Sequence, residues 1–316
     1  MSNPLTELVA LGQSPWIDFI LRSHMREGKF SALINAGKIV GATSNPTIFE
    51  KAIGGSADYD NQIASLVRQG VTDPKKIFDE VAITDIQMAA DNLHSVYVRT
   101  EGRDGYISLE VSPDLANDTQ GTIEQARYLW GRVQRPNVMI KVPATPEGLP
   151  AVEQLITDGL NINITLIFAL DVYEQVANAY LNALEKRVAA GQPIDKLASV
   201  ASFFVSRVDT EVDKRLDALH ANTSDSAKQA QIDALHGKAA IANAKIAYEI
   251  FQRLFKSDRF AALKAKGAQP QRCLWASTST KNPKYRDVLY VEELIGPDTV
   301  DTMPPQTIDA FRDHGV

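Results

Sequence analysis

Residues 137–145, NVMIKVPAT, predict a buried strand. Apolar residues surround a single lysine, Lys141, and prolines at positions 143 and 146 prevent the run from continuing as a helix. Burying an ammonium group without a partner costs free energy, so Lys141 has two interpretations. It is either a lysine at a strand end that is paired with a carboxylate, or a desolvated amine that can attack a carbonyl carbon.

Seven more apolar runs alternate with segments of helical periodicity, which indicates a parallel sheet. The eight predicted strands are centred on Ile17, Ile39, Leu109, Ile140, Leu166, Phe203, Leu274 and Leu289. Eight such repeats predict a closed α/β barrel of the (β/α)₈ type, and the last strand is expected within residues 287–297. A doubly wound open sheet is the alternative, but no glycine-rich dinucleotide motif follows the first predicted strand.

Composition narrows the possible functions. The 316 residues carry a net charge of -6, which argues against nucleic acid as a main partner but allows small phosphorylated ligands. The single Cys273 excludes an internal disulfide and a cysteine-rich zinc site. We expect one domain over residues 1–316, with no signal peptide, no membrane span and a cytoplasmic location. The five histidines have no ligand spacing, so no metal is assigned.

Polar residues gather where the predicted strands end, the edge that carries the active site in such barrels. In chain order these are Asp18, Thr43, Asn45, Glu110, Lys141, Asn163, Thr165, Ser202, Arg207, Ser277, Thr278 and Lys281. A lysine amine among acids, hydroxyls and amides suits imine formation with a ketone, followed by cleavage of the adjacent C–C bond. Arg207, Ser277 and Lys281 would then bind a phosphate at the far end of the substrate. Glu292 and Glu293, after the eighth predicted strand, are expected to be solvated loop charges.

Each residue also has a structural interpretation. Asp18 could cap the next helix, and Glu110 could serve only as the ion-pair partner of Lys141. Asn45 before a proline is a common turn former, and Thr165 could simply fill a strand. Arg207 could form a surface ion pair.

Several segments in this order resemble the transaldolase family, in particular a longer bacterial subfamily with members fused to a glucose-6-phosphate isomerase. They are GATSNPTIFEKAI at 41–53, ISLEVSP at 107–113, MIKVPAT at 139–145, NINITLIFA at 161–169, SFFVSRVD at 202–209 and LWASTSTKNP at 274–283. The resemblance implies a (β/α)₈ barrel that transfers a dihydroxyacetone unit without metal or organic cofactor. It implies donors such as sedoheptulose 7-phosphate or fructose 6-phosphate, a place in the non-oxidative pentose phosphate pathway, and a monomer or homodimer.

The resemblance also implies a role for each site residue. Lys141 resembles the Schiff-base lysine, Asp18 the acid/base for C–C cleavage, and Glu110 with Thr165 the pair that holds the catalytic water. Residues expected to bind the dihydroxyacetone hydroxyls and orient the lysine are Thr43, Asn45, Asn163 and Ser202. Arg207 and Ser277 resemble the phosphate ligands.

Two departures from the family pattern affect these expectations. Many transaldolases have an arginine two residues after the serine that matches Ser277, whereas this chain has Ser279, so Lys281 is expected to supply the missing charge. The chain also ends at Val316, whereas relatives continue through further helix, so two alternatives remain: a chain shortened at its C-terminus, or a barrel that closes with a stunted final helix.

Two rival functions are a class I aldolase that releases free dihydroxyacetone and a catalytically silent barrel that only binds a partner. The silent barrel is disfavoured because the acid, base and nucleophile candidates are all present.

Overall fold

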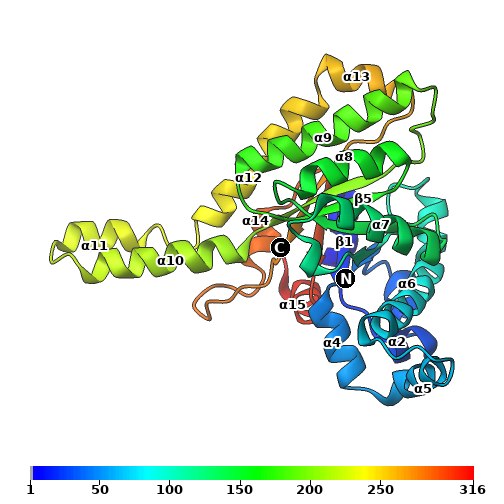
Figure 1. Cartoon of the computed structure of the whole chain (residues 1–316). Helices are drawn as coiled ribbons and strands as arrows, with labels where there is room; N and C mark the ends of the chain where they lie inside the picture. The colour runs from blue at the N-terminus through cyan, green and yellow to red at the C-terminus, as the bar shows by residue number, and fades with distance from the viewer. Residues whose placement is uncertain (1–2) are drawn as a thin grey trace.

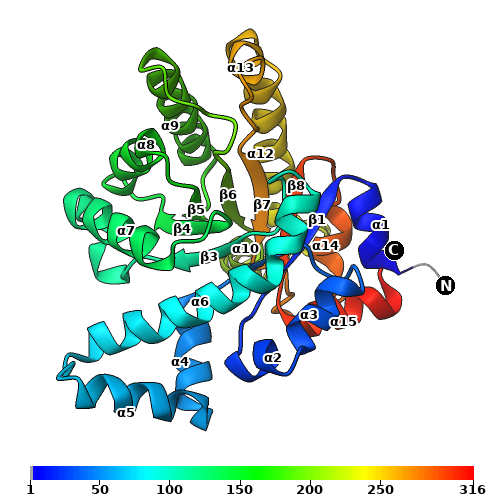
Figure 2. The ribbon, with the colours of Figure 1, turned by 90° about the vertical axis from the view of Figure 1, so that its right-hand side faces the viewer.

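The computed structural model describes residues 3–316 and contains a closed barrel of eight parallel strands in the order β1 to β8, which confirms the predicted fold class. The strands are β1 Gln13–Asp18, β2 Gly41–Thr43, β3 Ile107–Glu110, β4 Val138–Pro143, β5 Ile162–Ile167, β6 Ser199–Phe204, β7 Arg272–Ala276 and β8 Thr299–Met303. Figure 2 shows the strands at the centre with helices around them.

The helices that connect and flank the strands vary widely in length. They are α1 Pro4–Ala10, α2 Arg22–Arg26, α3 Lys29–Asn35, α4 Pro46–Gly54, α5 Asp60–Arg68, α6 Pro74–Arg99, α7 Thr119–Val133, α8 Gly148–Asp158, α9 Leu170–Ala189, α10 Ser206–Ala221, α11 Ser226–Asp233, α12 Ala239–Phe255, α13 Asp258–Lys264, α14 Leu289–Glu293 and α15 Pro305–His314, with 3₁₀ turns η1 Ala57–Tyr59 and η2 Pro113–Leu115. None of the helices within residues 3–316 is long and apolar enough to cross a membrane.

The eighth strand was predicted in the wrong place. Residues 287–297 contain the helix α14 instead of a strand, and β8 follows at Thr299–Met303, where it pairs with both β1 and β7. The apolar residues of the α14 region recur at helical spacing, whereas three of the five β8 residues are polar and look like a surface loop. The prediction that Glu292 and Glu293 are loop charges is also wrong, because both belong to α14 and pair with Arg286 and Lys245. The second strand lies a few residues later than predicted, at Gly41–Thr43.

Two layers of side chains fill the fold. The larger apolar cluster lies between the outer faces of the strands and the helices. A second cluster, which includes Trp16, Tyr106, Met139 and Leu274, fills the barrel interior. Below it a buried ion pair joins Arg272, at the start of β7, to the carboxylate of Asp104 at 3.0 Å. The N-terminal half of the barrel interior is therefore packed, whereas the interior opens into a cavity at the C-terminal ends of the strands.

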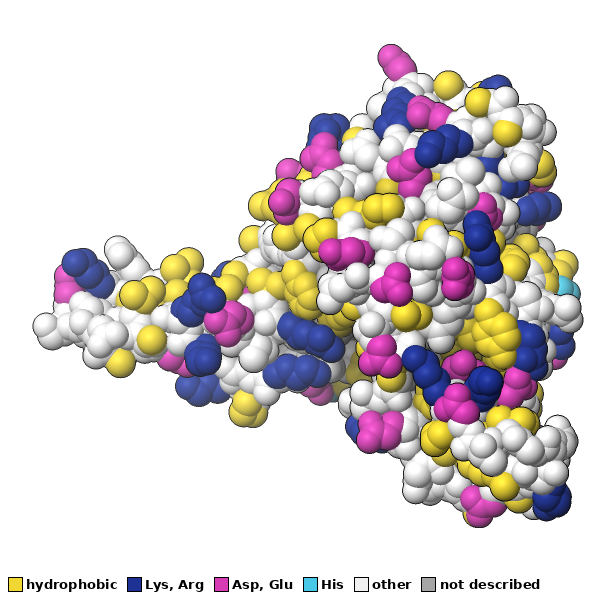
Figure 3. Space-filling model, viewed as in Figure 1, with side chains coloured by type: hydrophobic (Ala, Val, Ile, Leu, Met, Phe, Trp, Pro, Cys, Tyr) yellow, Lys and Arg dark blue, Asp and Glu magenta, His cyan; other side chains and the backbone are white. Residues whose placement is uncertain are grey.

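Two helical excursions extend from the barrel. Helices α4 and α5 leave between β2 and α6, and α10 with α11 form an arm that projects from the body (Figure 1). The base of the first excursion is held by Arg22, whose Nε donates to Asp85 Oδ1 at 2.6 Å while Tyr59 donates to Oδ2 at 2.9 Å. Burial raises the pKa of Asp85, and the Arg22 guanidinium opposes this shift, so the acid depends on its partner. Over the face shown in Figure 3, acidic and basic side chains are interspersed.

Candidate active site

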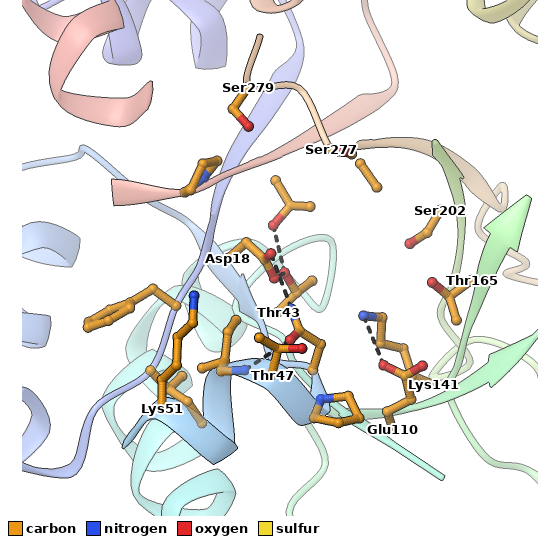
Figure 4. A pocket seen from close by; sticks show the side chains of 18 of the residues that line it. Asp18, Thr43, Thr47, Lys51, Glu110, Lys141, Thr165, Ser202, Ser277 and Ser279 are labelled. Carbon is orange, nitrogen blue, oxygen red and sulfur yellow. Dashed lines mark hydrogen bonds and ion pairs between the residues drawn. The ribbon is translucent and has the colours of Figure 1, made fainter. Parts of the chain in front are cut away.

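A cavity of about 880 Å³ opens at the C-terminal ends of the strands. Ten of the eleven predicted site residues line it: Asp18, Thr43, Asn45, Glu110, Lys141, Thr165, Ser202, Arg207, Ser277 and Lys281. Figure 4 shows how Lys141, Glu110, Thr165 and Asp18 converge on it from different strands. Strands far apart in sequence thus place these side chains in one space, as expected for this edge of a barrel.

Lys141 lies on β4 and is only 7% exposed. Its Nζ donates to the backbone carbonyl of Ser44 at 3.1 Å and lies 3.4 Å from Glu110 Oε2. The interpretation of Lys141 as a lysine paired with a carboxylate is therefore confirmed, and its amine also reaches the cavity, so its role as a nucleophile stays a prediction. The backbone carbonyl of Ser44 was missed, since a main-chain oxygen leaves no signal in a sequence.

Asp18 is held by hydroxyl and amide donors at the opposite wall. Thr43 Oγ1 donates to Asp18 Oδ1 at 2.6 Å, and Asn45 Nδ2 lies 3.4 Å from Oδ2. The hydroxyl oxygens of Thr43 and Thr302 are 2.7 Å apart, and since Thr43 gives its proton to Asp18, Thr302 is the donor of this pair. The helix-cap interpretation of Asp18 is wrong, because α2 is preceded by Leu21 and has no side-chain cap.

Asn45 has two contacts with different consequences. Its side-chain oxygen accepts from the amide of Ile48 at 3.0 Å and so caps α4, which is a structural role other than the turn former considered from the sequence. The amide nitrogen of the same side chain remains directed at Asp18. The cap therefore fixes the orientation of the group that faces the acid. Thr302 was missed because it lies on the strand that was predicted in the wrong place.

Asn163 lies beneath the cavity wall and is not among the described residues that line it. It accepts from Ser202 Oγ at 2.6 Å and donates to Ser108 Oγ at 3.0 Å, and all three residues are buried. The arrangement fixes the hydroxyl of Ser202, which does reach the cavity. Asn163 therefore acts on the site through Ser202.

An irregularity in β5 shapes the wall beside Lys141. The register with β6 shifts between Ile164 and Ile167, and Leu166 has a φ of 60°, a conformation that few non-glycine residues adopt. Consecutive residues of a regular strand face opposite sides, yet Thr165 and Leu166 both line the cavity. The buried Thr165 Oγ1 has no hydrogen-bond partner in the described structure, so this hydroxyl is free to bind water or substrate.

Cationic and hydroxyl groups form the other end of the cavity. The Arg207 guanidinium lies 4.8 Å from the centre of the Phe204 ring, and within residues 3–316 it forms no ion pair. Burial and the neighbouring guanidinium of Arg207 lower the pKa of Lys281, whose amine donates to Ser279 Oγ at 2.7 Å. Two crowded cations without a carboxylate between them favour an anionic ligand such as phosphate.

Lys51, on α4, also lines the cavity and was missed by the sequence prediction. Its position in a helix of ordinary amphipathic pattern gave no reason to separate it from surface lysines. Figure 4 shows it on the same side of the cavity as Thr47.

Comparison of the sequence with known proteins identifies the family of this chain. The transaldolase/fructose-6-phosphate aldolase family model matches residues 15–316. The chain belongs to this family. It is 49% identical over 314 residues to a protein named transaldolase from Trichodesmium erythraeum (strain IMS101), covering 99% of this chain and 82% of that relative.

Two other relatives agree with this membership. A transaldolase from Parafrankia sp. (strain EAN1pec) is 49% identical over 316 residues, covering 100% of this chain and 83% of the relative. A transaldolase 2 from Nostoc sp. (strain PCC 7120 / SAG 25.82 / UTEX 2576) is 49% identical over 313 residues, covering 99% of this chain and 82% of the relative. The family segments quoted from the sequence contribute Lys141, Glu110 and Arg207 to one cavity.

Proposed function

We propose that this chain is a transaldolase, which transfers a dihydroxyacetone unit from a ketose phosphate to an aldose phosphate through a covalent imine on Lys141. The proposed donors are sedoheptulose 7-phosphate or fructose 6-phosphate. The observation that carries the proposal is the position of the buried Lys141 amine, 3.4 Å from Glu110, in the same cavity as the hydrogen-bonded carboxyl group of Asp18. Nucleophile, proton carrier and cleavage base then face one substrate.

Imine formation requires proton transfers that the groups around Lys141 can perform. The neutral amine adds to the ketone carbon, and the ketone oxygen takes up a proton to give a carbinolamine. Loss of its hydroxyl as water leaves an iminium ion. We assign Glu110 and Thr165 to hold the water that carries these protons, since Glu110 faces the amine and the Thr165 hydroxyl has no other partner.

Bond cleavage then uses the iminium as an electron sink. Asp18 removes the proton of the hydroxyl on the far carbon of the bond to be broken, the C–C bond electrons move into the iminium to give an enamine, and that carbon leaves as an aldehyde. The acceptor aldehyde enters, the enamine carbon attacks it, and Asp18 returns its proton to the new alkoxide. Hydrolysis of the new iminium releases the ketose product and regenerates Lys141.

Substrate orientation is assigned to the hydrogen-bonded walls. Thr43, Asn45 and Ser202 would bind the hydroxyls of the dihydroxyacetone unit, with Asn163 holding Ser202 in place. Arg207, Ser277 and Lys281 would bind the phosphate at the distal end. Lys281 and Ser279 would together take the place of the arginine found in many relatives, which their mutual hydrogen bond of 2.7 Å supports.

Borohydride reduction in the presence of fructose 6-phosphate tests the proposal. The reduced adduct should be found by mass spectrometry on the peptide that contains Lys141, and Lys141→Ala should abolish it. Lys51→Ala is the matched control, because it removes another lysine of the same cavity and should leave the adduct on Lys141. An unmodified Lys141 peptide, or an adduct on a different lysine, would refute the assignment.

The class I aldolase alternative differs in the fate of the enamine. The three relatives reported above are named transaldolase or transaldolase 2, which favours transfer over release. Transfer predicts that cleavage of fructose 6-phosphate depends on an added acceptor aldehyde, such as erythrose 4-phosphate. Equal rates of cleavage with and without the acceptor would instead identify an aldolase.

A further inference from the structure

We infer that the hydrogen bond between Thr278 and Asp301 positions the phosphate-binding segment at residues 277–281. Asp301 does not line the cavity, so it acts as a positioning residue for phosphate recognition. The inference rests on the proposed function, because it concerns how that site holds the phosphorylated end of its substrate.

Asp301 is an unusual residue to find inside the wall of a barrel. It lies on β8, is 0% exposed and pairs in register with Trp275 of β7 and Pro15 of β1. Its Oδ1 accepts from Thr278 Oγ1 at 2.7 Å, whereas Oδ2 has no hydrogen-bond partner in the described structure. Within the described residues, Thr278 therefore provides the one hydrogen bond to the Asp301 carboxyl group. A buried acid with a single donor costs free energy and calls for a reason to be there.

The segment that follows β7 alternates between cavity and wall. Ser277 and Ser279 line the cavity, whereas Thr278 between them is 0% exposed and bonds to Asp301. Ser277 has a φ of 59°, a left-handed conformation that costs a non-glycine residue free energy unless the surroundings enforce it. The Thr278–Asp301 bond immediately after this residue is the side-chain contact that anchors the turn to the next strand.

The groups assigned to phosphate depend on this turn. The Ser277 hydroxyl lies 2.9 Å from that of Ser206, at the start of α10, next to Arg207. Ser279 accepts from Lys281 at 2.7 Å. Release of Thr278 would therefore displace a serine hydroxyl and a lysine amine together. The Lys141 end of the cavity lies on other strands and would keep its geometry.

Thr278→Val tests the inference, because valine keeps the volume of threonine but cannot donate to Asp301. The inhibition constant of inorganic phosphate, used as a competitive inhibitor against fructose 6-phosphate, should rise about tenfold, as expected for loss of one well-placed buried hydrogen bond. The KM for fructose 6-phosphate should rise in parallel, with little change in kcat. Thr278→Ser keeps the hydroxyl and should restore both constants.

Dihydroxyacetone distinguishes a loss of phosphate binding from a general structural defect, because only the general defect would reduce adduct formation with this substrate. It carries the ketone without a phosphate, so its borohydride-trapped adduct on Lys141 should form as readily in Thr278→Val as in the unsubstituted protein. Asp301→Ala should behave like Thr278→Val, whereas Asp301→Asn keeps an acceptor oxygen and should retain phosphate affinity. If Asp301→Ala does not fold, the two Thr278 variants decide.

Two results would overturn the inference. One is an unchanged phosphate inhibition constant in Thr278→Val, and the other is a parallel loss of the dihydroxyacetone adduct. Failure of the proposed function gives a different result, because the unsubstituted protein would then form no adduct at all.

Discussion

Replacing Asp301 by asparagine should change how the stability of this protein depends on pH. Burial raises the pKa of Asp301 from its ordinary value of 3.8 to about 7, and the hydrogen bond from Thr278 opposes this shift only in part. Asparagine has nearly the same shape and keeps an oxygen that can accept from Thr278. It carries no titratable proton, so the comparison isolates the charge.

The sign and size of the effect follow from proton linkage. A carboxyl whose folded pKa is raised contributes stability that is fully present below pH 3.8 and is lost as the pH rises through about 7. Each pH unit within this interval corresponds to about 1.4 kcal/mol, so the interval corresponds to about 4 kcal/mol in total. Asp301→Asn has no carboxyl group to titrate, so it does not lose this stability as the pH rises. Relative to the unsubstituted protein, Asp301→Asn should therefore gain about 4 kcal/mol between pH 4 and pH 8.

Urea unfolding followed by circular dichroism at several pH values between 4 and 8 measures this difference. The free energy of unfolding of the variant minus that of the unsubstituted protein removes the contributions of all other titrating groups. Asp114→Asn is the matched control, because the side chain of Asp114 is 80% exposed and its contacts, a hydrogen bond from Ser112 Oγ at 3.2 Å and an ion pair with Lys75 at 3.4 Å, lie at the surface. A difference that stays constant from pH 4 to pH 8, or that follows the control, would refute the reasoning.

Two further predictions concern the cleavage base and the buried ion pair. Asp18→Asn should slow donor cleavage by about 10²–10⁴-fold because the proton acceptor is lost, while the borohydride adduct with fructose 6-phosphate still forms. Measuring the aldehyde product in a stopped assay checks this prediction, and an unaltered cleavage rate would exclude Asp18 as the base. Arg22→Met should destabilise the fold by about 3–5 kcal/mol in urea unfolding, because Asp85 then stays buried with only Tyr59 as donor. The double variant Arg22→Met with Asp85→Leu should recover part of this loss of stability, because it removes the unpaired acid. If its loss in free energy of unfolding equals the sum of the losses of the two single variants, the unpaired buried acid is not what destabilises Arg22→Met.

Prediction from sequence succeeded where a local pattern carries the information. The strand around Lys141 is recognisable because a continuous apolar run between prolines is typical of a buried strand and too short for a buried helix. The alternation of such runs with helices predicts the barrel, and the barrel in turn predicts that the strand ends meet. That step placed Asp18, Glu110 and Lys141 together before any distance was known.

Prediction failed where burial depends on partners far away in the chain. The residues of β8, Thr299–Met303, look like a polar loop, and only hydrogen bonding to β1 and β7 makes them a strand. Thr302 and the buried carboxyl of Asp301 were missed for this reason. Leu166 was missed because a register shift in β5 turns a residue of the expected outer face towards the cavity.

The amino-acid sequence by itself determined the chemistry available to this protein: one lysine within an apolar strand, two acids at the ends of other strands, and cations for an anionic ligand. The tertiary structure alone decided which of these groups share a cavity and how each is held, from the donors around Asp18 to the hydroxyl of Thr165 that is left without a partner. The reason is physical. Residue type sets what a side chain can donate, accept or attack, whereas desolvation and hydrogen-bond geometry depend on neighbours that only the closed barrel brings together.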